Sequence, residues 1–471
     1  MYTMKPMKKL THRPFLFRRN SLLRRSLIFM LAAFFLAGCS RSAVSGAAAD
    51  SSLREQANSV PAGSESQSSL PEAESELASA LPEGERRVYE AIPLPQEMRA
   101  MWISFLEWRD ADLQNADSAR KTISTMFDNC VALGLNTVIV AVRPFSDALY
   151  PSAVYPWSHF LTGVQGGDPG YDPLALLVEE AHNRNLRIEA WINPYRVLNT
   201  VNGPDTLAPN NPAVQHPQLV CDVGGNLWYN PGLAEVRRMV ADGVREIVRH
   251  YDVDGIHFDD YFYPEFTAEQ RANGEDETFD AVLFAELGGQ MSLAEWRRDN
   301  VNKMVAAAYE AVKDENSTVS FGISPQGNNQ NNYETQYSDV RHWLVSEGYV
   351  DYVMPQLYWG FAYRTSGGRE SFAFANVCAE WAFYPRLDTV RLYAGLGAYR
   401  IGVGDGGNND QDEWHSGHNL ADMVTHLRTE ENMDGFALFR YAHLYDEEQP
   451  LAAEESAALT ALLLGQADNA A

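Results

Sequence analysis

The sequence is poor in cysteine and in basic charge, and it lacks the glycine-rich turns that bind phosphate. Four cysteines occur in 471 residues, with no Cys-x-x-Cys pair and no Cys/His cluster at zinc spacing. This argues against a disulfide scaffold and a structural zinc site. Basic residues number 37 against 63 acidic ones, which disfavours nucleic acid as a partner because its phosphates would be repelled. We therefore expect no cofactor, no metal ion and no bound nucleic acid.

Long apolar runs are scarce as well. The run at residues 27–36 is too short for a comfortable transmembrane helix and has the length of a signal-peptide core. Within residues 1–38 there are eight basic residues and no acidic one. The tetrapeptide Leu36-Ala37-Gly38-Cys39 then resembles a bacterial lipobox, which implies cleavage before Cys39 and a diacylglycerol on its sulfur. A plain signal peptide is the alternative. We expect an extracytoplasmic lipoprotein of the cell envelope, anchored to the membrane through Cys39.

Residues 39–92 are rich in Ser, Ala, Glu and Pro and almost free of aromatic residues. Such a segment buries too little apolar surface to offset its chain entropy, so the sequence predicts a disordered tether. Without residues 1–38, 29 basic residues remain against 63 acidic ones, a net charge of −34. That charge fits a solvated protein acting on a neutral or cationic substrate, although it does not choose a ligand.

Eight apolar, β-branched runs alternate with amphipathic stretches over residues 93–465. The runs are continuous rather than alternating, as expected for parallel strands buried on both faces. Strictly alternating βα units of this number predict a single (β/α)₈ TIM barrel of the α/β class. The rival is a doubly wound open sheet, but the glycine-rich turn usual for that fold is missing. The expected strands are residues 99–104, 137–142, 187–192, 253–258, 319–323, 350–354, 392–396 and 435–439.

The expected helices between these strands are 119–133, 173–185, 233–251, 294–315, 338–347, 371–384, 419–430 and 452–464. Several loops that follow strands are long and carry many aromatic residues. In a TIM barrel they gather on the C-terminal face, where active sites form. Buried thiols are the expected role of Cys130 and Cys378, since both lie among apolar residues at helical spacing.

The densest polar cluster follows the fourth strand, which ends in Asp259 and Asp260. Glycoside cleavage needs carboxylates as acid, base or nucleophile, and neighbouring carboxylates split their pKa values between those roles. Both are therefore candidate catalytic residues. Asp254 begins the same strand, so it belongs to the opposite face and is interpreted as structural.

Other polar residues at the ends of strands should converge on the same face and bind substrate. Amide groups suit sugar hydroxyl or acetamido groups, and an arginine there could instead form a salt bridge to a strand-end carboxylate. The candidate substrate-binding residues are Glu107, Arg143, Asn193, His257, Tyr261, Gln326, Gln356, Tyr358 and Arg440.

Five motif segments occur at residues 98–104, 143–150, 190–196, 254–263 and 354–359. Together they resemble the glycosyl-hydrolase-like family 10 domain, a likeness that extends over residues 95–450. It implies a barrel hydrolase of bacterial envelopes, and some members are understood to cleave peptidoglycan glycan strands stripped of their stem peptides.

The catalytic mechanism stays open. Residues 255–259 are similar to the fourth-strand motif of the alpha-amylase superfamily, which would make Asp259 the nucleophile. The acid Glu of that superfamily follows strand five, where this chain has Ser324-Pro325-Gln326, and Glu334 is the nearest carboxylate. The motif of family 18 chitinases would place its acid Glu at Tyr261. With an N-acetylated substrate, the acetamido oxygen could be the nucleophile while Asp259 and Asp260 supply orientation and acid.

The function predicted from these residues is hydrolysis of glycosidic bonds in a polysaccharide, with peptide-free peptidoglycan strands as the leading substrate. A hydrolase of another polysaccharide and a catalytically silent glycan-binding lipoprotein are the alternatives. A metal-dependent deacetylase is disfavoured because no Asp/His/His arrangement occurs. Oligomeric state, linkage and stereochemical outcome are not encoded in any motif.

Overall fold

The computed structural model describes residues 89–407 and 411–465. The expected signal peptide (1–38), Cys39 and nearly all of the expected tether (39–92) lie outside these residues. Within them, the main sheet has nine parallel strands in the order β10-β9-β8-β7-β3-β2-β1-β12-β11. The strands are β1 (Met98–Ile103), β2 (Thr137–Arg143), β3 (Arg187–Ile192), β7 (Gly255–Phe258), β8 (Ser320–Ile323), β9 (Tyr352–Val353), β10 (Arg391–Leu392), β11 (Ala394–Leu396) and β12 (Gly435–Leu438).

The two outermost strands, β10 and β11, are halves of one run interrupted only at Tyr393. β10 pairs with β9 and β11 pairs with β12, so this run closes the ring. The Tyr393 backbone N–H continues the ladder by donating to the Val353 carbonyl at 3.0 Å. Counting β10 and β11 as one strand leaves eight, and the predicted TIM barrel is confirmed.

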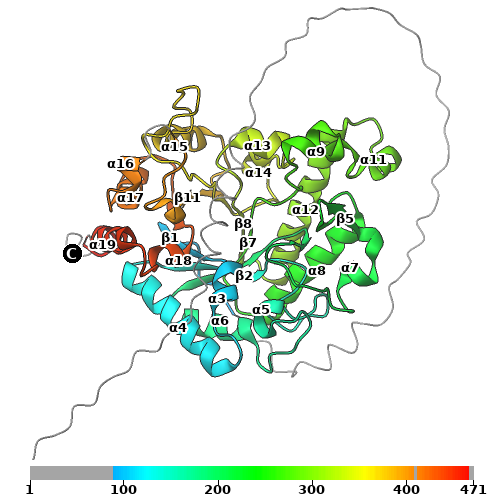
Figure 1. The fold of residues 1–471 in the computed structure, drawn as a ribbon, viewed down its shortest axis with the longest axis horizontal. Helices are drawn as coiled ribbons and strands as arrows, with labels where there is room; N and C mark the ends of the chain where they lie inside the picture. The colour runs from blue at the N-terminus through cyan, green and yellow to red at the C-terminus, as the bar shows by residue number, and fades with distance from the viewer. Residues whose placement is uncertain (1–88, 408–410, 466–471) are drawn as a thin grey trace, which may run out of the picture. The chain divides into compact units, whose positions relative to one another are not determined.

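Eight helices of the described chain form the outer layer (Figure 1). In the clearest case, α8 (Ala234–His250), the buried side chains Val236, Val240, Val244 and Ile247 form one apolar stripe along the helix. Cys130 and Cys378 are buried in this layer, as expected. No helix among the described residues is long and apolar enough to cross a membrane. The helices are α4 (Ala116–Leu133), α6 (Pro173–His182), α8 (Ala234–His250), α12 (Leu293–Glu315), α14 (Val340–Val345), α15 (Phe374–Phe383), α17 (Asn419–Leu427) and α19 (Pro450–Leu464).

The barrel interior combines large apolar side chains with a buried polar chain. Trp102, Trp191 and Tyr352 belong to its apolar cluster. Around them, Glu189 pairs with Arg187 at 3.2 Å and accepts a short hydrogen bond from the Tyr352 hydroxyl. Because every member has a partner, this chain can be buried at modest cost.

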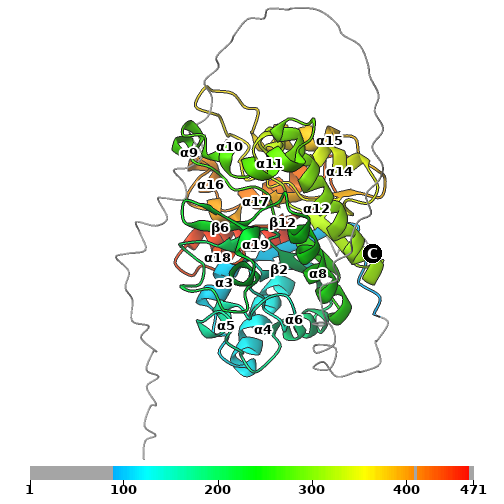
Figure 2. The ribbon, with the colours of Figure 1, turned by 90° about the vertical axis from the view of Figure 1, so that its right-hand side faces the viewer.

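The loops after the strands carry structure that the hydrophobic pattern did not predict. The loop after β3 folds into an antiparallel sheet of β4 (Arg196–Leu198), β6 (Asn226–Tyr229) and β5 (Val220–Val223), with α7 (Pro212–Gln215) and the 3₁₀ turn η2 (Pro217–Leu219) between them. The loop after β7 forms α9 (Ala268–Ala272), α10 (Glu275–Thr278) and α11 (Ala281–Leu287), which lie on one side of the barrel in both ribbon views (Figure 2).

Further short helices occupy the remaining loops on the same face. One of them, α3, begins directly after β1 because Ser104 and Glu107 form a capping box at its start. The short helices are α3 (Phe105–Asp110), α5 (His159–Thr162), α13 (Asn329–Glu334), α16 (Gln411–Trp414) and α18 (Tyr441–Leu444), together with the 3₁₀ turn η3 (Ala398–Arg400).

Candidate active site

Two carboxylates stand side by side at the carboxyl end of β7. Asp259 is 5% exposed, and its oxygens accept hydrogen bonds from the Trp191 indole N–H at 3.2 Å and the Asn193 amide at 2.8 Å. Asp260 is 8% exposed and accepts from the Gln356 amide at 2.9 Å. Successive side chains leave a strand in opposite directions, which explains why adjacent residues have different partners.

Burial dominates the titration of both carboxylates. Removal from water raises the pKa of Asp259 to about 7, against the opposing charge of Arg196 and with a further contribution from Asp260. Burial also raises the pKa of Asp260, although hydrogen bonds from Gln356 and Gln326 oppose the shift. A carboxyl group with a pKa near neutrality can both give and take a proton at physiological pH, which is what general acid–base catalysis requires.

Three amide side chains predicted for substrate binding lie around these carboxylates. Asn193 donates to Asp259, while its own oxygen accepts from the backbone N–H groups of Tyr195 and Arg196 at 3.2 and 2.7 Å. Gln356 also donates to the Ser324 carbonyl at 3.0 Å. Gln326 donates to Glu265 at 3.1 Å. These bonds fix the carboxylates in place, and contact with a substrate stays a prediction.

Two tyrosines predicted for substrate binding line the same mouth. Tyr261 follows the carboxylates directly, and its ring lies 6.5 Å from that of Trp228. Tyr358 stacks on Phe439 at 5.7 Å, and the charge of Asp260 contributes to raising its pKa, after burial and Tyr399. Aromatic faces beside carboxylates and amides are a common lining for carbohydrate.

His257 lies one layer below the mouth and is fully buried. Its ring nitrogens face the Tyr352 hydroxyl at 2.7 Å and the Ser324 hydroxyl at 3.0 Å, and the Trp102 indole lies at 3.3 Å. Burial lowers its pKa to about 3, so it is neutral at physiological pH. His257 thus lies between the Asp259 and Asp260 pair at the mouth and the Tyr352–Glu189–Arg187 chain of the barrel interior.

Glu107, Arg440 and Arg143 make their contacts with residues other than the two aspartates. The Glu107 carboxylate accepts from Ser104 at the start of α3 and forms a close ion pair with Arg440. Arg143 is 1% exposed and covers the Tyr155 ring at 4.5 Å. The register of β2 shifts between Ala141 and Arg143, so strand alternation did not predict where Arg143 would face. Its guanidinium has no hydrogen-bond partner among the described residues.

Two charged residues join the site without having been selected from the sequence. The Gln326 side chain hydrogen-bonds both Glu265 and Asp260 and so links them. Partial removal from water by the surrounding loops raises the pKa of Glu265, and repulsion from Asp260 adds to this, although the residue as a whole is exposed. Arg196 places its guanidinium over the Tyr261 ring at 4.2 Å. The only sequence signal for either was position: Glu265 lies shortly after the carboxylate pair, and Arg196 ends a segment of the family resemblance.

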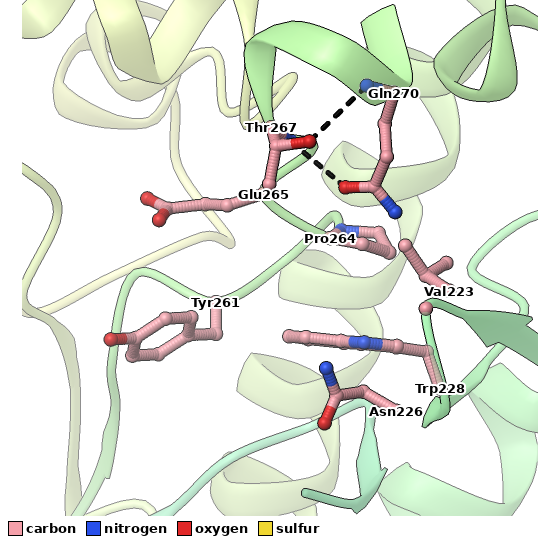
Figure 3. Close-up of a pocket in the computed structure, with 9 residues that line it drawn as sticks. Val223, Asn226, Trp228, Tyr261, Pro264, Glu265, Thr267 and Gln270 are labelled. Carbon is pink, nitrogen blue, oxygen red and sulfur yellow. Dashed lines mark hydrogen bonds between the residues drawn. The ribbon is translucent and has the colours of Figure 1, made fainter. Parts of the chain in front are cut away.

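A cavity of about 350 Å³ opens beside the carboxylates, between the β5–β6 hairpin and the loop after β7. Tyr261 and Glu265 belong to both the cavity and the carboxylate cluster, and their side chains extend to the same side (Figure 3). No group of His, Cys, Asp and Glu among the described residues is arranged to hold a metal ion. The lining residues are Val223, Gly224, Asn226, Trp228, Tyr261, Pro264, Glu265, Thr267 and Gln270.

A parallel barrel with a buried carboxylate pair, amides and aromatic rings at its C-terminal mouth defines a glycoside-hydrolase-like protein. The model of the family called glycosyl hydrolase-like 10 matches residues 97–416, and the chain belongs to this family. Membership supports a glycan-cleaving role on a carbohydrate substrate.

Relatives with curated descriptions agree with this membership. The chain is 35% identical to glycosyl hydrolase YngK of Bacillus subtilis over 381 residues, covering 77% of this chain and 71% of the relative. It is 33% identical to glycosyl hydrolase DigH of Escherichia coli over 340 residues, covering 65% and 74%. The glycoside hydrolase domain of PgaB from Bordetella bronchiseptica has a similar fold, with a TM-score of 0.51 at 13% identity over 77% of this chain and 99% of that one.

Proposed function

We propose that this protein hydrolyses glycosidic bonds in peptidoglycan-type glycan strands free of stem peptides, using Asp259 and Asp260. The observation that carries the proposal is the pKa of Asp259, raised to about 7 by burial at the C-terminal mouth of the barrel. There Asp259 exchanges a proton with the glycosidic oxygen or the attacking water. The expected substrate is the one implied by the family resemblance, and the aromatic and amide lining supports a glycan.

Asp259 and Asp260 are neighbours at one strand end, so a further carboxylate is needed across the cleaved bond from them, unless the substrate's acetamido group replaces it. Glu265 fits this role, since only the Gln326 amide separates it from Asp260 and it is exposed where substrate could reach it. Glu334, the carboxylate expected after strand five, instead bonds Gln330 within α13 at 3.0 Å. We therefore favour Glu265 over Glu334 as the partner of the aspartates.

The test is product release from peptide-free glycan strands by the chain from residue 40 onward, wild type beside Asp259→Asn. Loss of a catalytic acid–base group should lower kcat by about 10²–10⁴-fold while the variant still binds the strands. Glu265→Gln and its matched control Glu334→Gln decide between the two glutamates. Binding without cleavage by the wild type, across several polysaccharides, would favour a catalytically silent glycan-binding protein.

We also propose that Cys39 carries a lipid that anchors the protein to a membrane of the cell envelope. Support comes from the basic start, the apolar run and the Leu36-Ala37-Gly38-Cys39 tetrapeptide. Fractionation of cells expressing wild type and Cys39→Ser tests this directly. The wild type should sediment with membranes, whereas equal distribution of both proteins would contradict anchoring through Cys39.

A further inference from the structure

Arg196 is held at a fixed place beside the catalytic carboxylates. Its backbone N–H donates to the Asn193 side-chain oxygen at 2.7 Å, and the amide of the same Asn193 donates to Asp259 at 2.8 Å. Arg196 also pairs with Trp228 across β4 and β6. One amide therefore ties Asp259 to the start of the β4 strand, so the guanidinium belongs to the carboxylate site rather than to a distant surface.

Two aromatic rings lie close to this guanidinium. The Tyr261 ring lies 4.2 Å and the Phe145 ring 5.6 Å from its central carbon. Arg196 is only half-buried, and its side chain has neither an ion pair nor a hydrogen bond with the residues of the described ranges. Stacking between aromatic rings orients a guanidinium while leaving its planar donors free to bind.

Several arginines of the described barrel have carboxylate partners, whereas the Arg143 guanidinium, which covers Tyr155, has no hydrogen-bond partner there but is fully buried. Arg187 pairs with Glu189 at 3.2 Å, Arg297 pairs with Asp280 at 2.5 Å, and Arg440 forms a close pair with Glu107. In a chain with 63 acidic and 37 basic residues, carboxylate partners are abundant. An oriented arginine that has no carboxylate partner and lies next to the aspartates is suited to bind an anionic group of a ligand.

The three nearby carboxylates do not neutralise Arg196 fully. Its charge lowers the pKa of Asp259, Asp260 and Glu265, but burial outweighs this effect and raises all three. Asp259, whose pKa burial raises to about 7, thus retains a share of its protons near neutral pH. The positive charge at the mouth is then available to a ligand, and the partial burial of Arg196 strengthens an ionic hydrogen bond there.

We propose that Arg196 binds a carboxylate carried by the glycan, on a sugar at or next to the bond that is cleaved. This inference rests on the proposed hydrolase function and deepens it. A bidentate pair between guanidinium and carboxylate fits a free acid but not an amide, which has one acceptor oxygen and an N–H group. Arg196 would therefore select strands whose acidic substituents are free over strands in which a peptide has converted them to amides.

The test uses two versions of one substrate, so that only the charge differs. Peptide-free strands are used untreated, or after their carboxylates are coupled to methylamine. The wild type should show a kcat/KM that is about 10–100-fold higher on the free acid, mainly through KM. Arg196→Gln should bring this ratio close to one, and Arg196→Lys should keep part of it, because a lysine retains the charge without the planar fork.

Arg341→Gln is the matched control. Arg341 also covers a tyrosine, with its guanidinium 5.0 Å from the Tyr384 ring, but it lies on α14 in the outer helix layer. This variant should keep the wild-type ratio. Unfolding midpoints of all variants show whether each is folded.

Each result decides the inference. Equal rates of the wild type on both substrates would overturn carboxylate recognition while leaving hydrolysis intact. Equal losses on both substrates in Arg196→Gln would assign Arg196 to tuning the aspartates instead. If the wild type cleaves neither substrate, the proposed hydrolysis fails. Equilibrium binding of the two strands to wild type and Arg196→Gln then still tests Arg196, and no preference for the free acid would overturn its role.

Discussion

The two ends of strand β7 carry aspartates in opposite electrostatic states. Asp254, just before the strand, is fully buried, yet its pKa is lowered because hydrogen bonds from His182 and Tyr89 and the charge of Arg187 outweigh burial. The backbone N–H groups of Ile92 and Ile188 also donate to it, at 2.7 and 2.8 Å. Asp259, just after the strand, is nearly as buried, but its pKa is raised.

Two carboxyl groups that are almost equally buried therefore differ in pKa because different numbers of hydrogen-bond donors surround them. Asp254 is held as an anion by several donors, which agrees with its interpretation as a structural residue. Asp259 has donors from Trp191, Asn193 and the Tyr261 backbone as well as the charge of Arg196, and burial outweighs them together. Its ionised form is less well stabilised, and an incompletely satisfied carboxyl group is the kind that functional sites contain.

The largest expected effect separates the two ends by function. Asp259→Asn should lower kcat on the cleaved glycan by about 10²–10⁴-fold because the proton-exchanging group is lost. Asp254→Asn should leave the kcat of the folded molecules within about threefold, because Asp254 lies at the opposite face and touches no substrate. Rates on peptide-free glycan strands, normalised to folded protein, check this. A similar loss in both variants would show that the two ends are not functionally distinct.

The next effect separates the ends by stability. Asp254→Asn should lower the free energy of unfolding by about 2–4 kcal/mol, since an amide nitrogen would face the N–H groups that the carboxylate now accepts. Asp128→Asn is the control, because Asp128 is an exposed partner of Arg184 and its loss should change stability very little. Urea unfolding at pH 7 measures both. Equal stability of the two variants would refute the structural role of Asp254.

The same contrast marks what the sequence could and could not predict. Eight continuous apolar runs predicted the barrel, and the ends of those runs predicted Asp259 and Asp260, because chain order alone fixes which end of a parallel strand faces the mouth. Amides that follow strands, such as Asn193 and Gln356, were predicted for the same reason, and the structure places both against the aspartates.

The remaining features depend on packing between segments far apart in the chain. Arg143 turns toward Tyr155 because of a register shift that no hydrophobic pattern signals. Glu265 and Arg196 enter the site only because the loops after β7 and β3 fold back over the mouth. Loop residues have no fixed period, so residue type alone did not distinguish these two from other charged loop residues.

A smaller effect tests the electrostatic origin of the contrast. The raised pKa of Asp259 means that this group binds an extra proton on folding, so its own contribution to stability should fall as pH rises from about 4 to about 7. Asp259→Asn removes this group and should be more stable than the wild type by about 1–3 kcal/mol at pH 8, with little difference at pH 4. Urea unfolding at both pH values measures this. A stability difference that is the same at pH 4 and pH 8 would contradict the raised pKa.

The smallest effect concerns the segment that satisfies Asp254. The Tyr89 hydroxyl donates to Asp254 at 2.5 Å, and the Ile92 carbonyl accepts a close hydrogen bond from Arg187. Residues just before the expected barrel boundary at 93 thus supply hydrogen-bond donors to Asp254 at the N-terminal face of the barrel. Tyr89→Phe should lower the free energy of unfolding by about 1 kcal/mol, because the backbone donors and His182 remain.

Measured in the Asp254→Asn background, the same Tyr89→Phe change should cost clearly less, since the hydroxyl then meets a neutral partner. Thermal and urea unfolding of the four proteins in this cycle provide the comparison. If the two changes were simply additive, Tyr89 would stabilise the barrel by packing on His182, whose ring lies 5.2 Å away, and not through the carboxylate. Coupling between the two would instead show that the chain ahead of the barrel helps to hold Asp254 ionised, while Asp259 at the other end has no such support.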